Sequence, residues 1–476
     1  MFSRSRFASL VSGIARVAAL FGLLLLASPG FSQGLSGDGR LSISLNGAPI
    51  VRSGASSSTI QLSANVLPPD ATNKEVQWSS NNPSVASVDS SGNVTAVSVG
   101  TAIITVTSLD GSFTAQCVVT VNSAGLPVKS VLPCASVGGD FMLFIKADGT
   151  LWACGLNTNG QLGLGHTNTV NVPTQIGTDT DWAAIAAGTY HSLALKNDGS
   201  LWVWGNTASG ALGATVANNK IPSRILADSR WVDIAAGNSH SVALKDDGTV
   251  WAWGLCDYLQ SPDNTGVPKK YSSNLNSDFV SVTAGDRLTF AVKSSGQVYS
   301  AGYNAFAQTG KNVASTQESF GMASPLSTVA SIAAGSGHGI AIFANGSLWA
   351  WGTSMAGSAG LGSSTNVKIP LQIGTSTDWV QVVSGDYFSV ALNSSGKIFS
   401  TGNNTYGALG SGNTTARTTF AQIGLDSDWT FVAAGGYSTC AIKADGSFYT
   451  WGQNSSGQLG IGSTGSYSTL PCKITF

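Results

Sequence analysis

Charged residues are scarce in this chain. Lys, Arg, Asp and Glu make up 10% of the 476 residues, whereas an average soluble protein has about 25%. The net charge is −1, and the Lys and Arg residues are scattered singly, whereas a nucleic-acid-binding protein concentrates them in a basic stripe. We therefore expect no nucleic-acid partner. Long charged helical stretches are also missing, and this absence, together with 58 glycines, indicates an all-β protein.

Histidine and cysteine are equally rare. Three of the four histidines (His191, His240 and His338) follow the same repeated motif, which favours a structural hydrogen bond over catalysis. The cysteines show no CxxC or Cys/His spacing typical of zinc, and most replace apolar residues of the repeat, so we expect buried free thiols. They are Cys117, Cys134, Cys154, Cys256, Cys440 and Cys472.

Long apolar runs are limited to one, at residues 17–27. Three arginines precede it and small residues follow it as far as Ser32, which is the pattern of a secretory signal. The alternative is an uncleaved anchor, but the run is short for a span of about 20 residues. We predict a cleaved signal at 1–32, a Gly/Ser/Asp-rich linker at 33–40 and an exported mature chain without a membrane span.

Residues 41–122 alternate apolar and polar positions with period two, and Pro, Asn and Gly separate the runs. This pattern predicts a β-sandwich, with Trp78, Val85, Val88 and Val94 facing its core. The stretches VQWSSNNPSVASV, GNVTA and GTAIITV within it closely resemble the bacterial immunoglobulin-like domain of group 2. The resemblance implies a spacer or presentation module of surface proteins. A short linker is expected at 123–130.

The rest of the chain is a repeat. The phrase Asp-Gly-Ser-Leu-Trp-Val-Trp-Gly at 198–205 has close copies at 247–254 and 345–352, and weaker copies complete a set of seven at intervals of 48 to 50 residues. Each unit can be divided into four short strands, with an Asp-Gly hairpin before the third. Seven such units predict a seven-bladed β-propeller over 131–476. Trp202 and Trp204 share one face of their strand and should pack between blades.

Ala-Ala-Gly-x-x-His-Ser, Asp-Gly-x-Leu-Trp-x-Trp-Gly and Gly-Gln-Leu-Gly recur in this array. Together they resemble the regulator-of-chromosome-condensation repeat. The best-known role in that family is guanine-nucleotide exchange on a small nuclear GTPase with chromatin binding. Export, the missing basic patch and the even unit length argue against this role. Light sensing is not expected either, because the tryptophans used by the plant UV-B photoreceptor are replaced. Units 3 and 4 depart from the pattern, which we interpret as loop variation within complete blades.

The two residues after each first-strand glycine vary from unit to unit while the framework repeats. Repeat geometry places all seven of these loops around one mouth of the central channel, where aromatic and Arg side chains are typical of binding hot spots. The alternative is that the loops vary because nothing constrains them. The candidate partner-binding residues are Asp140, Phe141, Tyr190, Asp286, Arg287, Asp386, Tyr387, Phe388 and Tyr437.

The sequence gives little support for a metal site, a phosphate-binding loop or a disulfide. Asp-x-Asp pairs at 179–181 and 426–428 could ligate calcium, but their recurrence favours a turn-capping role. The glycine connectors lack the Gly-Lys-Ser/Thr of a phosphate loop. Cys134 and Cys472 could form a disulfide only if strands from both ends of the array shared a blade, and no bridge is expected. We therefore predict no metal and no cofactor.

These features predict an exported, non-enzymatic binding or adhesion-type protein, secreted or at the cell surface and monomeric, with a protein or glycan partner. One alternative is an enzyme inhibitor, as some secreted members of the family are. Another is a polysaccharide-active enzyme, which would need two carboxylates within about 5–10 Å. The spacing of Asp140, Asp286 and Asp386 in the sequence does not give the distances between them.

Overall fold

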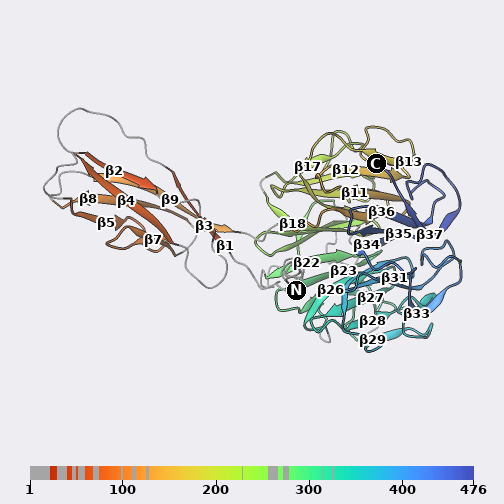
Figure 1. Ribbon diagram of the computed structural model, residues 1–476. Coiled ribbons are helices and arrows are strands. Elements are labelled where there is room, and N and C mark those ends of the chain that lie inside the picture. Colours follow the sequence, from red (N-terminus) through yellow and green to blue (C-terminus); the bar gives the residue numbers. More distant parts are fainter. Residues whose placement is uncertain are drawn as a thin grey trace, which may run out of the picture. The chain divides into compact units, whose positions relative to one another are not determined.

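The protein is described by a computed structural model (Figure 1), and its chain divides into two compact units between Pro127 and Val128. Each unit is treated by itself. Most of the predicted export signal and of the predicted linker 33–40 lies outside the described residues. These are 22–28, 40–45, 50–51, 59–67, 74–97, 100–109, 114–124, 128–227, 229–255, 266–271, 278–312, 315–323 and 326–476.

The first unit contains the predicted sandwich. Its core holds Leu62, Val85, Val94 and Ile104, all buried, with Trp78 packed against them. One sheet has the order β3 (Ile50–Val51), β1 (Gly22–Ser28), β9 (Thr114–Ala124), β8 (Gly100–Ser108) and β5 (Val76–Ser80). The other has the order β2 (Arg40–Leu45), β4 (Thr59–Leu67), β7 (Asn93–Ala96) and β6 (Ala86–Val88).

β1 comes from the apolar run that the sequence predicts to be an export signal. It pairs antiparallel with β9 over its whole length and briefly with β3. Cleavage near Ser32 would remove it. The strands β9, β8 and β5 would then still form a continuous sheet, because β8 pairs with both of its neighbours.

The second unit is the predicted seven-bladed propeller, with seven antiparallel sheets of four strands each (Figure 1). Blade 1 consists of β10 (Cys134–Val137), β11 (Phe141–Ile145), β12 (Leu151–Gly155) and β13 (Val170–Gln175), and blade 2 of β14 (Trp182–Ala187), β15 (His191–Lys196), β16 (Leu201–Gly205) and β17 (Ser223–Ile225). Blade 3 consists of β18 (Trp231–Ala236), β19 (His240–Lys245), β20 (Val250–Gly254) and β21 (Lys269–Lys270), and blade 4 of β22 (Phe279–Ala284), β23 (Leu288–Lys293), β24 (Val298–Tyr303) and β25 (Gln317–Met322). Blade 5 consists of β26 (Val329–Ala334), β27 (His338–Phe343), β28 (Leu348–Gly352) and β29 (Val367–Gln372). Blade 6 consists of β30 (Trp379–Gly385), β31 (Phe388–Asn393), β32 (Ile398–Gly402) and β33 (Arg417–Gln422), and blade 7 of β34 (Trp429–Gly435), β35 (Ser438–Lys443), β36 (Phe448–Gln453) and β37 (Tyr467–Lys473). The blade 5 connector contains the 3-10 turn η1 (Met355–Gly357).

The Asp-Gly phrase forms the hairpin between the second and third strands of a blade. In blade 2, Gly199 adopts a φ of 80°, a conformation that favours glycine, and its N–H donates to the Lys196 carbonyl. The Asp198 carboxylate accepts from the Ser200 N–H, and the Ser200 hydroxyl accepts from Trp202 Nε1 at 2.9 Å. One tripeptide therefore fixes both the turn and the first tryptophan.

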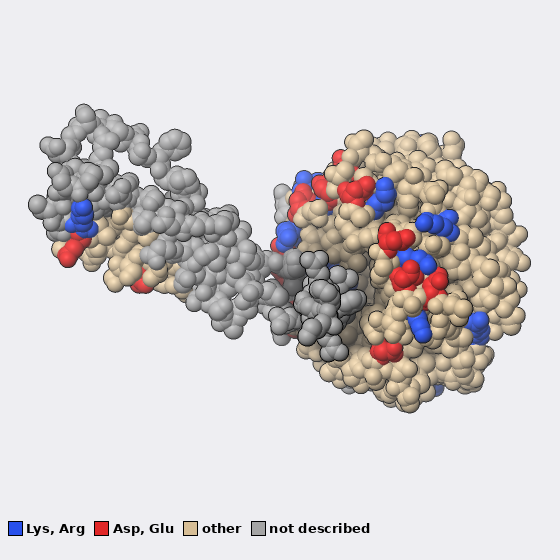
Figure 2. All heavy atoms as spheres, viewed as in Figure 1, with Lys and Arg blue, Asp and Glu red and all other residues tan. Residues whose placement is uncertain are grey.

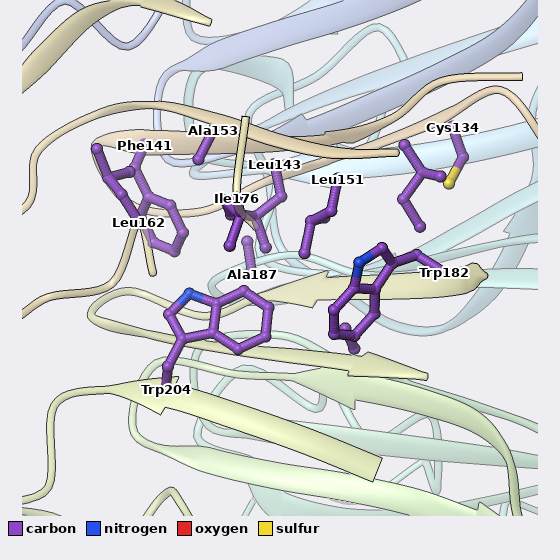
Figure 3. Close-up of a cluster of buried hydrophobic side chains, with 12 residues drawn as sticks. Cys134, Phe141, Leu143, Leu151, Ala153, Leu162, Ile176, Trp182, Ala187 and Trp204 are labelled. Carbon is purple, nitrogen blue, oxygen red and sulfur yellow. The ribbon is translucent and has the colours of Figure 1, made fainter. Parts of the chain in front are cut away.

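The second tryptophan of the phrase holds neighbouring blades together. Trp204 is fully buried against Leu143, Leu151 and Leu162 of blade 1 (Figure 3), and its Nε1 donates to the carbonyl of Gln161 at 2.8 Å. Trp253, Trp351 and Trp451 make the same bond to their preceding blades. Trp202 is half-buried instead, and it packs on Trp182 of its own blade at 5.7 Å.

The ring closes where blade 7 meets blade 1, and each blade is one continuous stretch of sequence. Phe144 packs edge-on against Phe448 at 5.7 Å, and the last residue, Phe476, contacts both rings at 5.5 and 5.0 Å. Cys154 takes the place of the second tryptophan, and its thiol donates to the Gln458 carbonyl at 3.2 Å.

Four of the six cysteines have described side chains, and all four are free thiols: Cys134, Cys154 and Cys440 are buried, and Cys472 is half-buried. Cys134 belongs to the innermost strand of blade 1, whereas Cys472 belongs to the outermost strand of blade 7. Cys117 and Cys256 have side chains outside the described part. Blades 3 and 4 are complete despite their departures from the motif, as predicted.

Candidate binding site at the mouth of the central channel

The first strand of every blade lines the central channel, which holds a cavity of about 720 Å3. Within a blade, the first and third strands run toward the same face, because successive strands are antiparallel. The loop after the first strand and the connector after the third strand therefore meet at that face. We call the end of the cavity formed there the mouth. The predicted residues among its lining are Asp140, Asp286, Asp386, Tyr387 and Tyr437.

Three carboxylates at the mouth come from blades far apart in sequence. Each is held by a neutral side chain from an adjacent blade, which orients it without cancelling its charge. Gln458 Nε2 of blade 7 donates to Asp140 at 3.2 Å, Asn238 Nδ2 of blade 3 donates to Asp286 at 2.7 Å, and the Ser336 hydroxyl of blade 5 donates to Asp386.

These carboxylates influence one another electrostatically. Burial raises the pKa of Asp386, and the negative charges of Asp286 and Asp140 raise it further, against the opposing effect of the Ser336 hydrogen bond. Burial also raises the pKa of Asp140. Because like charges raise a carboxyl pKa only when they are close, the folded ring brings together acids that the sequence separates by about 100 residues or more.

Tyrosines form the adjoining wall of the mouth. Tyr387 is held at a φ of 57°, and the rings of Tyr406 and Tyr437 contact edge to face with centroids 5.2 Å apart. All three line the cavity and are half-buried. Burial raises the pKa of Tyr387 and of Tyr437, and the nearby Asp386 charge adds to both shifts.

The structure changes the membership of the candidate site. Phe141 and Phe388 have no exposed surface, because each is the first residue of a second strand and packs between blades, so we remove both. Tyr190 and Arg287 are exposed at the face but do not line the cavity. Tyr406 lines the cavity and was not predicted, because it belongs to a connector rather than to a first loop. Noting that connectors and first loops share one face would have found it.

Lys129, near the start of the propeller unit, lines the opposite end of the cavity. Lys129 Nζ lies 3.3 Å from the Asp233 carboxylate and 3.1 Å from the Ser281 hydroxyl. Asp233 is on β18, five residues before Asn238 of the following loop, which is roughly 17 Å at the rise of a strand. The Lys129 charge is thus paired with an acid remote from the mouth. On the propeller face drawn in Figure 2, acidic and basic side chains are interspersed and most of the surface is uncharged.

The three recurrent histidines are buried bridges between blades. His191 Nε2 lies 2.9 Å from the Ser241 hydroxyl, and His338 makes the same contact with Ser389 at 2.9 Å. His240 lies 3.1 Å from the Thr289 hydroxyl. Each partner belongs to the next blade, so these side chains serve the structural role that their recurrence predicts.

The Asp-x-Asp pairs hold a lysine. Lys443 Nζ lies 2.9 Å from Asp426 and 3.2 Å from Asp428, and Lys196 is held in the same way by the pair at 179–181. A lysine ammonium group therefore occupies the position that calcium would need. Across the described residues, no three His, Cys, Asp or Glu side chains lie close enough together to form a metal site.

A propeller whose blades repeat a common framework and differ in their surface loops is a protein-interaction scaffold. The family model of the RCC1-like domain matches residues 180–476, and that of the regulator of chromosome condensation (RCC1) repeat matches 148–195. The chain therefore belongs to the RCC1-like domain family, as its repeat motifs predict. The model of the bacterial Ig-like domain (group 2) matches residues 49–119, within the sandwich.

Solved structures with this fold include yeast RCC1 (Prp20) bound to Kap60, which is 22% identical, covers 74% of this chain and 85% of its own, and has a TM-score of 0.63. Human WBSCR16 is 22% identical, with coverage of 69% and 93% and a TM-score of 0.60. At this identity the likeness establishes the fold alone.

Curated relatives match short segments. An uncharacterised protein of Clostridium acetobutylicum is 43% identical over 82 residues, which is 17% of this chain and 21% of that protein. An alpha-L-arabinofuranosidase of Bifidobacterium longum is 38% identical over 96 residues, which is 19% of this chain and 9% of the enzyme. Because the matched share of each relative is small, their activities are not transferred. The described residues include no helix of the length and apolarity that a membrane span requires.

Proposed function

We propose that this protein is an exported, non-enzymatic binding protein that holds a protein or glycan partner at the mouth of its propeller. The observation that supports this most is the cavity mouth itself. Variable loops of several blades gather three carboxylates and three tyrosines there, around a framework that otherwise repeats. Side chains that differ at repeated positions and converge on a concavity are the usual composition of a binding site.

Export and presentation complete the proposal. The basic and apolar N-terminus supports secretion with cleavage near Ser32, and bacterial Ig-like domains of this group are common in exported proteins. The domains we propose are a signal at 1–32, an Ig-like spacer at 41–122 and a propeller at 131–476, joined by linkers at 33–40 and 123–130. The mature protein would act as a monomer, secreted or at the cell surface.

The test is affinity capture with the full-length chain as bait, from culture medium or a native surface extract. A variant combining Tyr387→Ala, Tyr406→Ala and Tyr437→Ala should lose most of the captured partner, because aromatic side chains dominate binding hot spots. Tyr467→Ala, on the outermost strand of blade 7, is the matched control and should retain it. Equal capture by both variants would refute a binding role for the mouth. If a captured enzyme loses activity when the purified chain is added to its assay, the chain is an inhibitor.

One observation favours a second candidate, the hydrolysis of a polysaccharide. The pKa values of Asp140 and Asp386 are both raised in a shared cavity, and a carboxyl group with a raised pKa can serve as a general acid. A glycan-hydrolysis screen with the wild-type chain and Asp386→Asn decides between the candidates. Turnover that disappears in the variant would overturn the non-enzymatic proposal.

A further inference from the structure

The three mouth carboxylates repel one another. Their hydrogen-bond partners Gln458, Asn238 and Ser336 are neutral, and the Lys129 ammonium group is bonded to Asp233 at the opposite end of the cavity. A neutral ligand such as a sugar would leave the repulsion in place, whereas a positive charge entering the mouth would relieve it. Arg287 is exposed at the same face but does not line the cavity. The charge inside the mouth is therefore negative, and it favours a cationic occupant.

The aromatic wall favours the same chemistry. Tyr387 and Tyr437 lie near Asp386, and Tyr406 packs against Tyr437. Tyrosine rings attract a cation placed over their faces. A planar guanidinium combines charge, several N–H donors and a face that stacks on rings. The cavity of about 720 Å3 is large enough for a side chain but not for a folded domain, so the occupant must protrude from its carrier.

From this geometry we infer that the mouth binds a cationic side chain, above all an arginine, that projects from a protein partner. The carboxylates of Asp140, Asp286 and Asp386 receive its N–H groups, and the tyrosines contact its faces. The inference rests on the proposed function and narrows it, because it commits to a protein partner with a basic protrusion.

The probe is a blocked pentapeptide with one central arginine, titrated calorimetrically into the full-length chain at low ionic strength. Its counterpart carries citrulline, which keeps the shape but loses the charge. We expect the citrulline peptide to bind roughly tenfold more weakly or worse, and the binding of the arginine peptide to weaken as salt is added. Equal affinity for the two peptides would overturn the inference.

Variants locate the binding. Asp140→Asn, Asp286→Asn and Asp386→Asn combined should reduce arginine-peptide affinity by roughly tenfold or more, while Asp426→Asn, outside the mouth, should leave it unchanged. Relief of the repulsion should also raise the melting temperature of the triple variant, which separates lost binding from lost folding. Unchanged peptide affinity in a folded triple variant would contradict the inference.

Partner capture distinguishes this inference from the proposed function. If capture depends on the three tyrosines but is unaffected by the three Asp→Asn changes, the mouth binds a partner and the cation inference is wrong. Binding to a glycan that persists in the triple variant would have the same meaning. If capture is independent of both sets of residues, the proposed function fails as well.

Discussion

At the scale of single residues, the histidines show how burial sets protonation. Burial, with a smaller contribution from the His240 charge, lowers the pKa of His191 to about 3. Burial likewise lowers the pKa of His240 and of His338 to about 4. All three are therefore neutral near pH 7, and each holds a hydroxyl of the next blade.

This makes the propeller sensitive to acid. An unfolded histidine has a pKa of about 6.5, so below that pH the unfolded chain binds more protons than the folded chain. Stability should therefore be full above about pH 6.5 and should fall toward pH 4, by about 1.4 kcal/mol per histidine per pH unit. Denaturant unfolding at several pH values measures this dependence.

The array provides the control substitution, because blades 1 and 6 carry Phe141 and Phe388 at the histidine position. A variant combining His191→Phe, His240→Phe and His338→Phe should show a much flatter dependence between pH 6.5 and 4. Parallel curves for the variant and the wild type would show that other groups cause the acid sensitivity.

The same scale shows where sequence prediction succeeds and fails. Recurrence correctly assigned His191, His240 and His338 to the framework. The prediction that Phe141 and Phe388 belong to the exposed binding surface was wrong. The second strand begins at these two residues, and the first residue of that strand faces inward, whereas the residue before it belongs to the loop. Tyr406 was missed because its neighbours at the mouth come from another part of each repeat.

At the scale of elements, a lysine at the end of the second strand joins the first and third strands of several blades. In blade 7, Lys443 Nζ lies 4.9 Å from the centre of the Trp429 ring and 5.4 Å from that of Tyr449. Its hydrogen bond to Asp426 raises the lysine pKa, and a similar bond to Asp428 adds to this effect against partial burial. The arrangement recurs around Lys196, Lys245 and Lys293.

Replacing this lysine should therefore lower the stability of the blade. Lys443→Met keeps much of the side-chain length but loses the charge, and we expect it to lower the free energy of unfolding by about 1 kcal/mol, since ion pairs near the surface are screened and cation–ring contacts are modest. Urea unfolding compares it with Lys473→Met, an exposed control on β37. Equal losses of unfolding free energy in the two variants would mean that the ion pairs and ring contacts of Lys443 add no stability. If calcium restored the stability of Lys443→Met, the Asp-x-Asp pair could bind the metal after all.

The elements themselves were predictable because the repeat fixes them locally. The Asp-Gly turn, the period-two strands and the constant interval between the first-strand and hairpin glycines need only short-range chemistry. The lysine that each Asp-x-Asp pair binds was not predictable in this way, because it lies 15 to 17 residues further along the chain, on the second strand.

At the scale of the whole molecule, the ring depends on its single seam between blades 7 and 1. Phe476 lies there against Phe144, Trp152 and Phe448, with ring centroids 5.0 to 5.5 Å apart. Phe476→Ala should cost about 1–3 kcal/mol of unfolding free energy, which corresponds to the loss of a partly buried aromatic cluster. Thermal unfolding measures the loss.

Hydrogen exchange locates the effect of that substitution. Protection should fall first in β10–β12 and β34–β36, which flank the seam, while Thr475→Ala should leave it unchanged. A loss spread evenly over all seven blades would show that the seam is no weaker than any other blade contact.

Blade number was predictable from the repeat count, but the composition of the mouth was not. Asp140, Asp286 and Asp386 lie in blades 1, 4 and 6, and no spacing along the chain gives a distance across a ring. The pairing of Lys129 with Asp233 likewise depends on where the chain enters the channel. Long-range electrostatics emerge only from the closed ring.

The contiguity of the blades has a consequence for how the protein is made. Residues 135–154 of blade 1 bury their outer face against residues 433–474, which emerge from the ribosome roughly 300 residues later, and contacts of such separation form late. Until blade 7 has been synthesised, the Phe144 side of blade 1 lacks the apolar side chains that bury it. Assembly must therefore end at the seam, and a chaperone that shields this one apolar face would protect the whole molecule during its synthesis.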